Sequence, residues 1–329
     1  MTALAATRAR PTFDAAEWAR RNAWTLGLLV LLALLLAFTK IIQPNYGAFG
    51  IQGLGISILP LAFAAVAQAI VVIAGGIDLS IGSMMALTSV VAAIAMEGQS
   101  STFAIVVVAG VLGLGVILGA INGTLVVVTH VPDIIVTLAT SFVWAGLALL
   151  VTAAPGGAAA PWLMSLTSGA FFSDWLPKAA VVLVVLVALI WVPLSQSRFG
   201  VSFYAVGSDQ LAAFRSGVPI GRTRVMAYAV AGLFGGLAGL SLTASTGIGT
   251  PVPGPYTLQS VAAVVLGGVS LAGGRGGVFG PIVAVIVLQL IQNDTTFLGI
   301  DPNYALVVQG VILVGVLILG SALESRRAD

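Results

Sequence analysis

The stretch AWTLGLLVLLALLLAFTKII, residues 23–42, is almost entirely apolar and carries a single charge, on Lys40. Because an α-helix rises about 1.5 Å per residue, about 20 apolar residues cross the hydrocarbon core of a bilayer. Basic residues precede the stretch, but its apolar part is too long for the core of a signal peptide, and no small-residue cleavage site follows it. The sequence therefore predicts a retained membrane-spanning helix.

Similar apolar segments, bounded by charges, prolines or glycine and asparagine clusters, follow along the chain. Of the 329 residues, 59% are hydrophobic and only 7% are charged, whereas a soluble domain has about 25% charged residues. This composition excludes an ordinary water-soluble enzyme and predicts an all-α polytopic membrane protein. We expect about ten transmembrane helices, over residues 23–42, 58–74, 82–96, 103–128, 134–152, 178–194, 225–246, 258–271, 278–291 and 304–320.

The arginines indicate the orientation of these spans. With the N-terminus inside the cell, all arginines and His130 fall on the cytoplasmic side, and only Lys40 and Lys178 fall outside, as the positive-inside rule requires. Both termini are then cytoplasmic, and Asp294 is expected in an outer loop. The expected organisation is a cytoplasmic segment 1–22, a transmembrane permease domain 23–321 with a cytoplasmic coupling loop 195–224, and a cytoplasmic tail 322–329.

The residue inventory argues against catalysis by this chain. It has no cysteine and one histidine, His130, so thiolate metal sites, histidine metal clusters and Ser/His/Asp triads are not expected. No GxxxxGK[ST] motif occurs, so the chain is not expected to hydrolyse ATP by a P-loop mechanism. The net charge of +2 does not indicate a nucleic-acid-binding face. We expect a non-enzyme without cofactor or metal.

The motif AGGIDLSIGS, residues 74–83, joins the second and third expected spans. Gly75 and Gly76 permit positive φ and close backbone approach, and a broken helix at membrane depth is tolerated only inside protein or along a water-filled path. Asp78 is the only acid in this apolar region, and an intramembrane acid is by default functional. Two interpretations stay open: Asp78 caps the next helix by accepting amides near Ile81 and Gly82, or it lines a pathway.

A second glycine run, LGGVSLAGGRGGVFGP at residues 266–281, joins the eighth and ninth expected spans. Aligning Gly75 and Gly76 with Gly267 and Gly268 suggests an internal duplication of the kind seen in many transporters. The alignment crosses six expected spans instead of five, so either a short span is miscounted or the two runs share only their turn chemistry.

The cytoplasmic loop 195–224 contains a compact helix signal. Ser208 is expected to cap a helix that starts at Asp209 and ends at Gly217. A helix of about two turns is not stable alone in water and must pack on something. Two interpretations stay open: a surface helix packed on its own protein, or a docking helix for a cytoplasmic partner. The docking residues would be Ser208, Asp209, Leu211, Phe214, Arg215 and Gly217.

Taken together, the motifs resemble the permease subunit of ribose-type sugar ABC importers, within the branched-chain amino acid and ribose permease family. The resemblance covers nearly the whole chain. It rests on AGGIDLSIGS at 74–83, GAINGTLV at 119–126, VPDIIVTLAT at 131–140, RFGVSFYAVGSDQLAAFRSGV at 198–218 and VAAVVLGGVSLAGGRGGVFG at 261–280, in this order and spacing.

The resemblance implies a type II importer-like fold in a bacterial cytoplasmic (inner) membrane, with two permeases around one path and surrounding lipid. It also implies a cytoplasmic ATPase with two nucleotide-binding modules, which binds the ATP, and a periplasmic or lipid-anchored sugar-binding protein. The loop 195–224 would then contain the ATPase-docking helix. The expected pathway or gate residues are Gly75, Gly76, Asp78, Ser80, Asn122, Gly267 and Gly268.

The chain departs from the family pattern at several positions. The family commonly has Tyr-Glu-Leu-Asp where this chain reads Tyr256, Thr257, Leu258 and Gln259. Such losses favour a divergent copy paired with a more typical permease in a heterodimer over a homodimer. The alternative functions are a stand-alone secondary transporter or channel, and an ABC permease for branched-chain amino acids or nucleosides.

Overall fold

The computed structural model describes residues 23–252 and 254–301, together with residues 304, 307, 310, 311, 314 and 315. The segments 1–22 and 322–329 and most of the expected span 304–320 lie outside the described residues. The helices are α2 (Ala23–Ile42), α3 (Ala48–Ile73), α4 (Ile81–Met96), α5 (Ser101–Thr129), α6 (Asp133–Val151), α7 (Pro161–Thr167), α8 (Lys178–Gln196), α9 (Arg198–Ser208), α10 (Gln210–Arg215), α11 (Ile220–Thr246), α12 (Tyr256–Leu266) and α13 (Phe279–Phe297).

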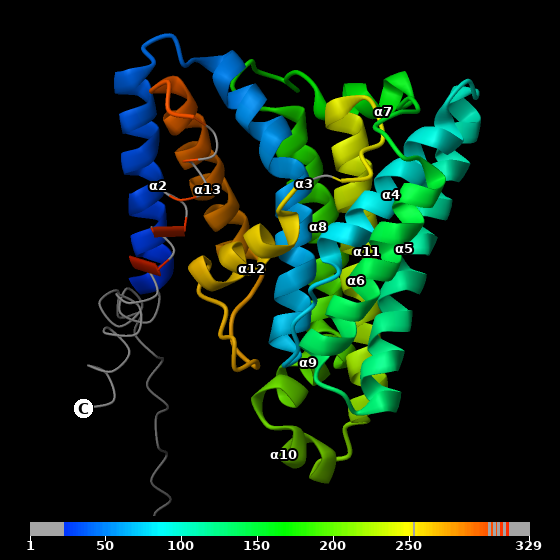
Figure 1. Cartoon of the computed structure of the whole chain (residues 1–329). Helices are drawn as coiled ribbons and strands as arrows, with labels where there is room; N and C mark the ends of the chain where they lie inside the picture. The colour runs from blue at the N-terminus through cyan, green and yellow to red at the C-terminus, as the bar shows by residue number, and fades with distance from the viewer. Residues whose placement is uncertain are drawn as a thin grey trace, which may run out of the picture.

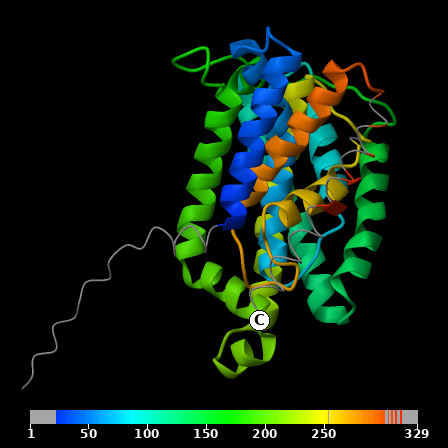
Figure 2. The same cartoon turned by 90° about the vertical axis from the view of Figure 1, so that its left-hand side faces the viewer.

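The long helices run side by side and give the molecule two distinct ends (Figure 1; Figure 2). The connection between α2 and α3, the short helix α7 and the C-terminal end of α13 lie at one end. Helices α9 and α10 lie at the other. The two ends therefore present different elements.

Six of the described helices, α2, α3, α5, α6, α8 and α11, are long and apolar enough to cross a membrane. The fold is that of a polytopic membrane protein. Helices α4 and α12 are apolar but shorter, and the expected count of about ten spans is not confirmed. In particular, the expected span 258–271 is an 11-residue helix, α12. At about 1.5 Å per residue it rises only about 16 Å, roughly half of a bilayer core.

Two helices extend well beyond the expected spans, because the glycine-rich residues before 58 and the polar residues after 291 were expected to lie outside them. Helix α3 begins at Ala48 instead of residue 58, and Pro60 lies in its interior. Neighbouring helices tolerate such a proline inside a membrane protein. Helix α13 continues to Phe297, so Asp294 lies within it, 4% exposed, and not in an outer loop.

The contact between α5 and α11 depends on glycine. A Cβ at Gly115 would overlap the carbonyl oxygen of Gly232, and a Cβ at Gly119 would overlap that of Tyr228. A Cβ at Gly123 would lie 2.8 Å from the Cα of Val225. The spacing of four residues on α5 is the small-residue pattern that lets membrane helices approach closely. The two backbones therefore pack against each other with no side chain between them.

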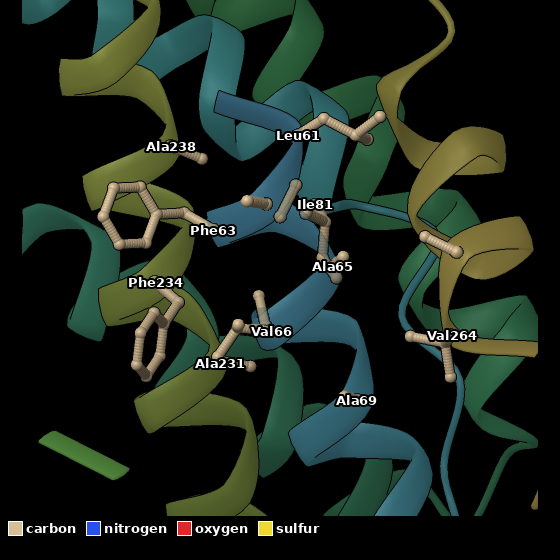
Figure 3. Close-up of a cluster of buried hydrophobic side chains, with 14 of the residues drawn as sticks. Leu61, Phe63, Ala65, Val66, Ala69, Ile81, Ala231, Phe234, Ala238 and Val264 are labelled. Atoms are coloured by element: carbon tan, nitrogen blue, oxygen red, sulfur yellow. The ribbon is translucent and has the colours of Figure 1, made fainter. Parts of the chain in front are cut away.

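Helix α3 forms the centre of the core. Its side chains from Ala62 to Ile73 are fully buried. Figure 3 shows α3 between α11, which contributes Ala231, Phe234 and Ala238, and α12, which contributes Val264. The Phe63 and Phe234 rings lie 6.3 Å apart. The other core residues on α3 are mainly alanines and valines, so the neighbouring helices approach α3 closely along its length.

Candidate functional site

Asp78, Ser80 and Asn122 form a buried polar cluster between the α3–α4 connection and α5. Each is 0% exposed. The Ser80 N–H and hydroxyl both donate to Asp78 Oδ1 at 2.7 Å, and Asn122 Nδ2 donates to Ser80 Oγ at 2.6 Å. Asp78 Oδ2 and Asn122 Oδ1 have no hydrogen-bond partner within the described part of the chain. Three of the expected pathway residues are therefore in one hydrogen-bonded group.

Asp78 was expected to cap α4 by accepting amides near Ile81 and Gly82, and the structure gives it a different donor. Asp78 does not accept amides of Ile81 and Gly82; its carboxylate closes a turn with the N–H of Ser80, two residues along the chain. The Gly82 N–H instead donates a hydrogen bond to Thr257 Oγ1 of α12 at 3.1 Å. An orphan amide in the first turn of α4 is thus satisfied by another helix. Thr257 stands where the resembling family commonly has glutamate.

Several helices hold the 74–80 connection in place. With its amide oriented to satisfy both groups, Gln68 of α3 donates to the carbonyl of Asp78 at 2.8 Å and accepts its N–H at 3.3 Å. Thr137 of α6 accepts the N–H of Leu79 at 3.0 Å. The non-helical backbone is therefore satisfied by buried side chains, as the low-dielectric interior of a membrane protein requires.

An ion pair that the sequence analysis did not identify lies beside the same connection. Asp133, at the start of α6, pairs with Arg224 of α11 at 2.6 Å and accepts a hydrogen bond from the hydroxyl of Tyr228 at 2.7 Å. A Cβ at Gly76 would overlap the Asp133 carboxylate, so glycine is required there for close packing. Arg224 had been interpreted only as a sign of orientation, although an acid opening one helix and an arginine opening another were both visible in the sequence.

The glycine runs end α3 and α12 in the same way. Gly75 has φ +82° and Gly268 has φ +78°, the left-handed conformation that favours glycine. The N–H of Gly76 bonds to the carbonyl of Val71 at 3.0 Å, and the N–H of Val269 bonds to that of Val264 at 3.1 Å. Both are Schellman-type helix ends. Shared turn chemistry is therefore confirmed.

The expected alignment of the two runs is wrong by one residue. Gly75 corresponds to Gly268 and not to Gly267, which is the C-cap of α12. A Cβ at Gly267 would overlap the start of α13 at Pro281, and a Cβ at Gly268 would meet the ring of Trp24. The Trp24 indole donates to the carbonyl of Leu266 at 2.9 Å. Gly267 and Gly268 therefore contact α13 and α2, away from the Asp78 cluster.

A different part of the second run meets the first, at what we call the glycine junction: Gly75, Gly207, Gly273 and Gly274. The N–H of Gly274 donates to the carbonyl of Ile73, the last residue of α3, at 2.9 Å. A Cβ at Gly207 would overlap that carbonyl oxygen, and a Cβ at Gly273 would lie 2.7 Å from the carbonyl oxygen of Gly207. The two glycine-rich connections and α9 are thus in backbone contact.

Helix α10 is the short helix expected in the loop 195–224, but its cap is one residue later than predicted. Asp209, not Ser208, is the N-cap, and its Oδ1 accepts the amides of Leu211 at 2.9 Å and Ala212 at 3.0 Å. Ser208 is the last residue of α9 and lies against Gly274. The Asp209 side chain reaches two amides, which makes it the better cap. Gly217, with φ +80°, follows the end of α10 as expected.

Two large apolar side chains of α10 are largely exposed on the described part of the chain. Leu211 is 58% and Phe214 is 67% exposed, whereas Ala213 is buried. Arg215 is also exposed. Beside α10 lies a hollow of about 850 Å³, whose lining includes His130, Phe214, Val218, Arg222 and Arg224. The helix and the hollow form one surface with apolar and basic groups at this end of the molecule.

Comparison with known proteins places these features in a family. Residues 50–317 match the family described as branched-chain amino acid transport system / permease component. The chain is 35% identical over 301 residues to the ribose import permease protein RbsC of Bacillus subtilis (strain 168), covering 89% of this chain and 92% of the relative. It is 32% identical to RbsC of Escherichia coli (strain K12), covering 87% of this chain and 90% of the relative.

The fructose import permease protein FrcC of Rhizobium meliloti is 31% identical, with 87% of this chain and 82% of that protein covered. No solved structure gives a significant match. The named relatives are transport permeases, which fits the expectation that this chain is not an enzyme.

Proposed function

This chain belongs to the branched-chain amino acid transport system / permease component family, and on that premise we propose that it is the membrane-embedded permease of an ABC importer for a simple sugar. The observation that carries the proposal is the similarity to ribose and fructose import permeases along almost the whole chain. It favours a sugar over a branched-chain amino acid or nucleoside. It also favours an ATP-driven importer over a stand-alone secondary transporter or channel.

We place the ATPase at α10, and this end of the molecule in the cytoplasm. Exposed Leu211 and Phe214 support this position, since a short helix that leaves its apolar side chains uncovered needs a partner to bury them. The ATPase carries two nucleotide-binding modules and binds the ATP. The permease lies in a bacterial inner membrane with both termini in the cytoplasm, in a ten-span, type II importer-like fold.

A second permease completes the pathway in this proposal, and a sugar-binding protein, periplasmic or lipid-anchored, delivers the substrate at the opposite end. A heterodimer is favoured because Thr257 and Gln259 stand where the family commonly has acids. Pathway residues are proposed at the Asp78 cluster and its neighbouring glycines, namely Gly75, Gly76, Asp78, Ser80 and Asn122, and separately at Gly267 and Gly268, where α12 ends. An uncharged sugar needs hydrogen bonds and no fixed charge, and serine and asparagine supply them.

In this mechanism, closure of the ATPase moves α10 and therefore α9. The glycine junction supports a direct relay, because Gly207 of α9 touches the backbone of both glycine-rich connections. A displacement of α9 is passed on directly, since the atoms that Gly207 meets there are backbone atoms of Ile73 and Gly274. The connection that holds Asp78 then moves with the docking helix, and the pathway opens inward without any covalent chemistry in this chain.

The test is reconstitution of the permease in liposomes together with an ABC ATPase, a second permease and a sugar-binding protein. We expect radiolabelled D-ribose or D-fructose to accumulate only when all components and ATP are present. Uptake by the permease alone, driven by an ion gradient, would support the secondary transporter instead. A Walker-A lysine variant of the ATPase serves as the control for ATP dependence.

A further inference from the structure

A polar hollow lies at the end of the molecule opposite α10. It is formed by the α2–α3 connection, the first turns of α3 and the last turns of α13 (Figure 1). Its volume is about 400 Å³, within the range of about 300–1,000 Å³ typical of small-molecule sites. The polar lining residues are Gln43, Asn45, Tyr46, Ser57, Asn293 and Thr296, and no charged side chain of the described residues lines the hollow.

The rim of this hollow is held in place by the rest of the chain. The Lys40 ammonium donates to the carbonyls of Pro44 at 2.6 Å and Tyr46 at 3.1 Å, which fixes the short connection after α2. The Tyr46 and Phe297 rings meet edge to face with centroids 5.9 Å apart. An apolar wall therefore joins the two segments beneath the polar groups. The α2–α3 connection, which forms part of the hollow, is therefore held by contacts with α2 and α13.

The side-chain amides of the hollow are the groups open to a ligand, whereas the Ser57 and Thr296 hydroxyls already donate to the carbonyls of Gly53 and Gln292. Gln289 Nε2 donates to Asn293 Oδ1 at 3.1 Å, which orients that amide beside the Tyr46 hydroxyl. No hydrogen bond of the Gln43 or Asn45 side chain to the described residues is found. Amides supply both donors and acceptors. A set of uncharged amides and hydroxyls beside aromatic rings suits a ligand with several hydroxyl groups and no charge.

We propose that this hollow is a binding site for a neutral monosaccharide, the first site on the permease to take up the sugar released by the binding protein. The inference rests on the proposed function. It adds a site at the outer end of the molecule, made by the α2–α3 connection and α13, which is separate from the Asp78 cluster.

Gly53 allows a test that removes no existing contact. It lines the hollow, and a Cβ at this position would meet no atom within 4 Å. Gly53→Phe fills the hollow and replaces a helix glycine by a better helix former. Gly110→Phe is the matched control, because a Cβ at Gly110 in α5 also meets nothing within 4 Å and lies outside the hollow.

A second variant removes hydrogen bonding at constant shape. Asn293→Leu deletes the amide of a residue that lines the hollow, and Gln292→Leu deletes an amide at the preceding residue of α13, which does not line it. The measurement is sugar imported per ATP hydrolysed by the reconstituted assembly, with labelled D-ribose and D-fructose as probes. We expect Gly53→Phe to abolish import and Asn293→Leu to lower it roughly 5- to 10-fold, the size of one lost hydrogen bond to substrate. Sugar import by the two control variants should stay within twofold of the wild type, and their basal ATP hydrolysis should not change.

The results distinguish failure of the proposed sugar site from failure of the proposed importer function. If the wild-type assembly imports neither sugar, the proposed function fails and the inference fails with it. If the wild type imports a sugar, and both Gly53→Phe and Asn293→Leu import it at the wild-type rate, only the inference is overturned. Equal losses in a lining variant and its matched control overturn it as well, because a site in the hollow requires a difference between them.

Discussion

The two glycine-rich connections end their helices with the same turn and then diverge. After Gly75 the chain needs only five residues to begin α4, and it carries Asp78 into a buried cluster. After Gly268 it needs ten residues to begin α13, and the residue in the place of Asp78 is Leu271, which is 49% exposed. A Schellman end breaks a helix wherever glycine allows positive φ. The residues that follow the break decide whether the connection is buried in the core or exposed.

The two connections also differ in what holds them. The first is tied by side chains of α3 and α6, namely Gln68 and Thr137. The second is tied near its start by Trp24 of α2, and further along by backbone contacts to Ile73 and Gly207. The first connection is therefore part of the buried core. The second bridges the core, α2 and the docking segment, which suits it to transmit movement.

Replacing Gly207 should have the largest effect, because this residue touches both connections at once. The valine side chain in Gly207→Val would overlap the carbonyl of Ile73, and backbone cannot move aside as a side chain can. We expect a loss of about 3 kcal/mol or more in stability, at the upper end of the cost of overpacking. Thermal unfolding of the purified permease in nanodiscs measures this. Gly110→Val is the control, because a Cβ at Gly110 meets no atom within 4 Å. Equal unfolding temperatures for the two variants would contradict the close backbone contact of Gly207 at the glycine junction.

The next largest effect is expected for Phe214→Asp on α10. If this exposed ring is an anchor for the ATPase, its loss should weaken copurification roughly 30-fold, about 2 kcal/mol. Membrane insertion should not change, because Phe214 packs on little of its own chain. Phe172→Asp introduces the same charge at an exposed phenylalanine of the connection between α7 and α8 and should leave copurification intact. Unchanged copurification of Phe214→Asp would exclude this helix as the docking site.

The buried acid separates the two connections most directly. Asp78→Ala leaves the Ser80 amide without its acceptor in a buried site, which should cost about 1–3 kcal/mol. Leu271→Ala at the equivalent position of the second connection should stay within about 0.5 kcal/mol, as is usual away from buried features. Asp78→Asn keeps an acceptor and should preserve folding and ATPase association.

Transport by Asp78→Asn then distinguishes the two interpretations of this residue. Normal transport would restrict Asp78 to holding the turn. Loss of transport with normal ATPase association would support its place on the pathway. Unfolding of the asparagine variant would contradict the hydrogen-bonding account, because an amide oxygen can accept the same two bonds from Ser80.

Local rules predicted much of this site. The first glycine pair indicated where α3 ends, and the composition of 208–217 indicated a short capped helix; both depend on neighbouring residues only. The expected span 258–271 ran past the end of α12 at Leu266. The prediction of the cap failed by one residue because Ser208 and Asp209 are both good capping residues, and only the backbone geometry decides between them. The glycine spacing on α5 was visible in the sequence and could have predicted the contact with α11.

Contacts between distant segments could not be predicted in this way. The pairing of Asp133 with Arg224 joins residues 91 apart, and Thr257 reaches Gly82 across 175 residues. Neither pair has a local signature. The prediction of the end of α13 failed for a different reason: residues 292–294, which follow the expected span 278–291, are polar and resemble a loop in a hydropathy profile. They continue as a helix, in which Asn293 accepts a hydrogen bond from Gln289 and Asp294 is buried.

The smallest effect compares the two left-handed glycines themselves. Gly75→Ala and Gly268→Ala should each cost about 1–2 kcal/mol for the strained backbone. Gly268→Ala should cost about 1 kcal/mol more, since its Cβ meets the Trp24 ring and displacing that ring breaks the hydrogen bond to Leu266. In a Trp24→Ala background this difference should disappear, because both the ring that the Cβ meets and the hydrogen bond that it donates are gone. Thermal unfolding of the four variants in nanodiscs completes the cycle. A difference that persists without the indole would mean that Trp24 does not hold the second turn, and that α2 is not coupled to it through this contact.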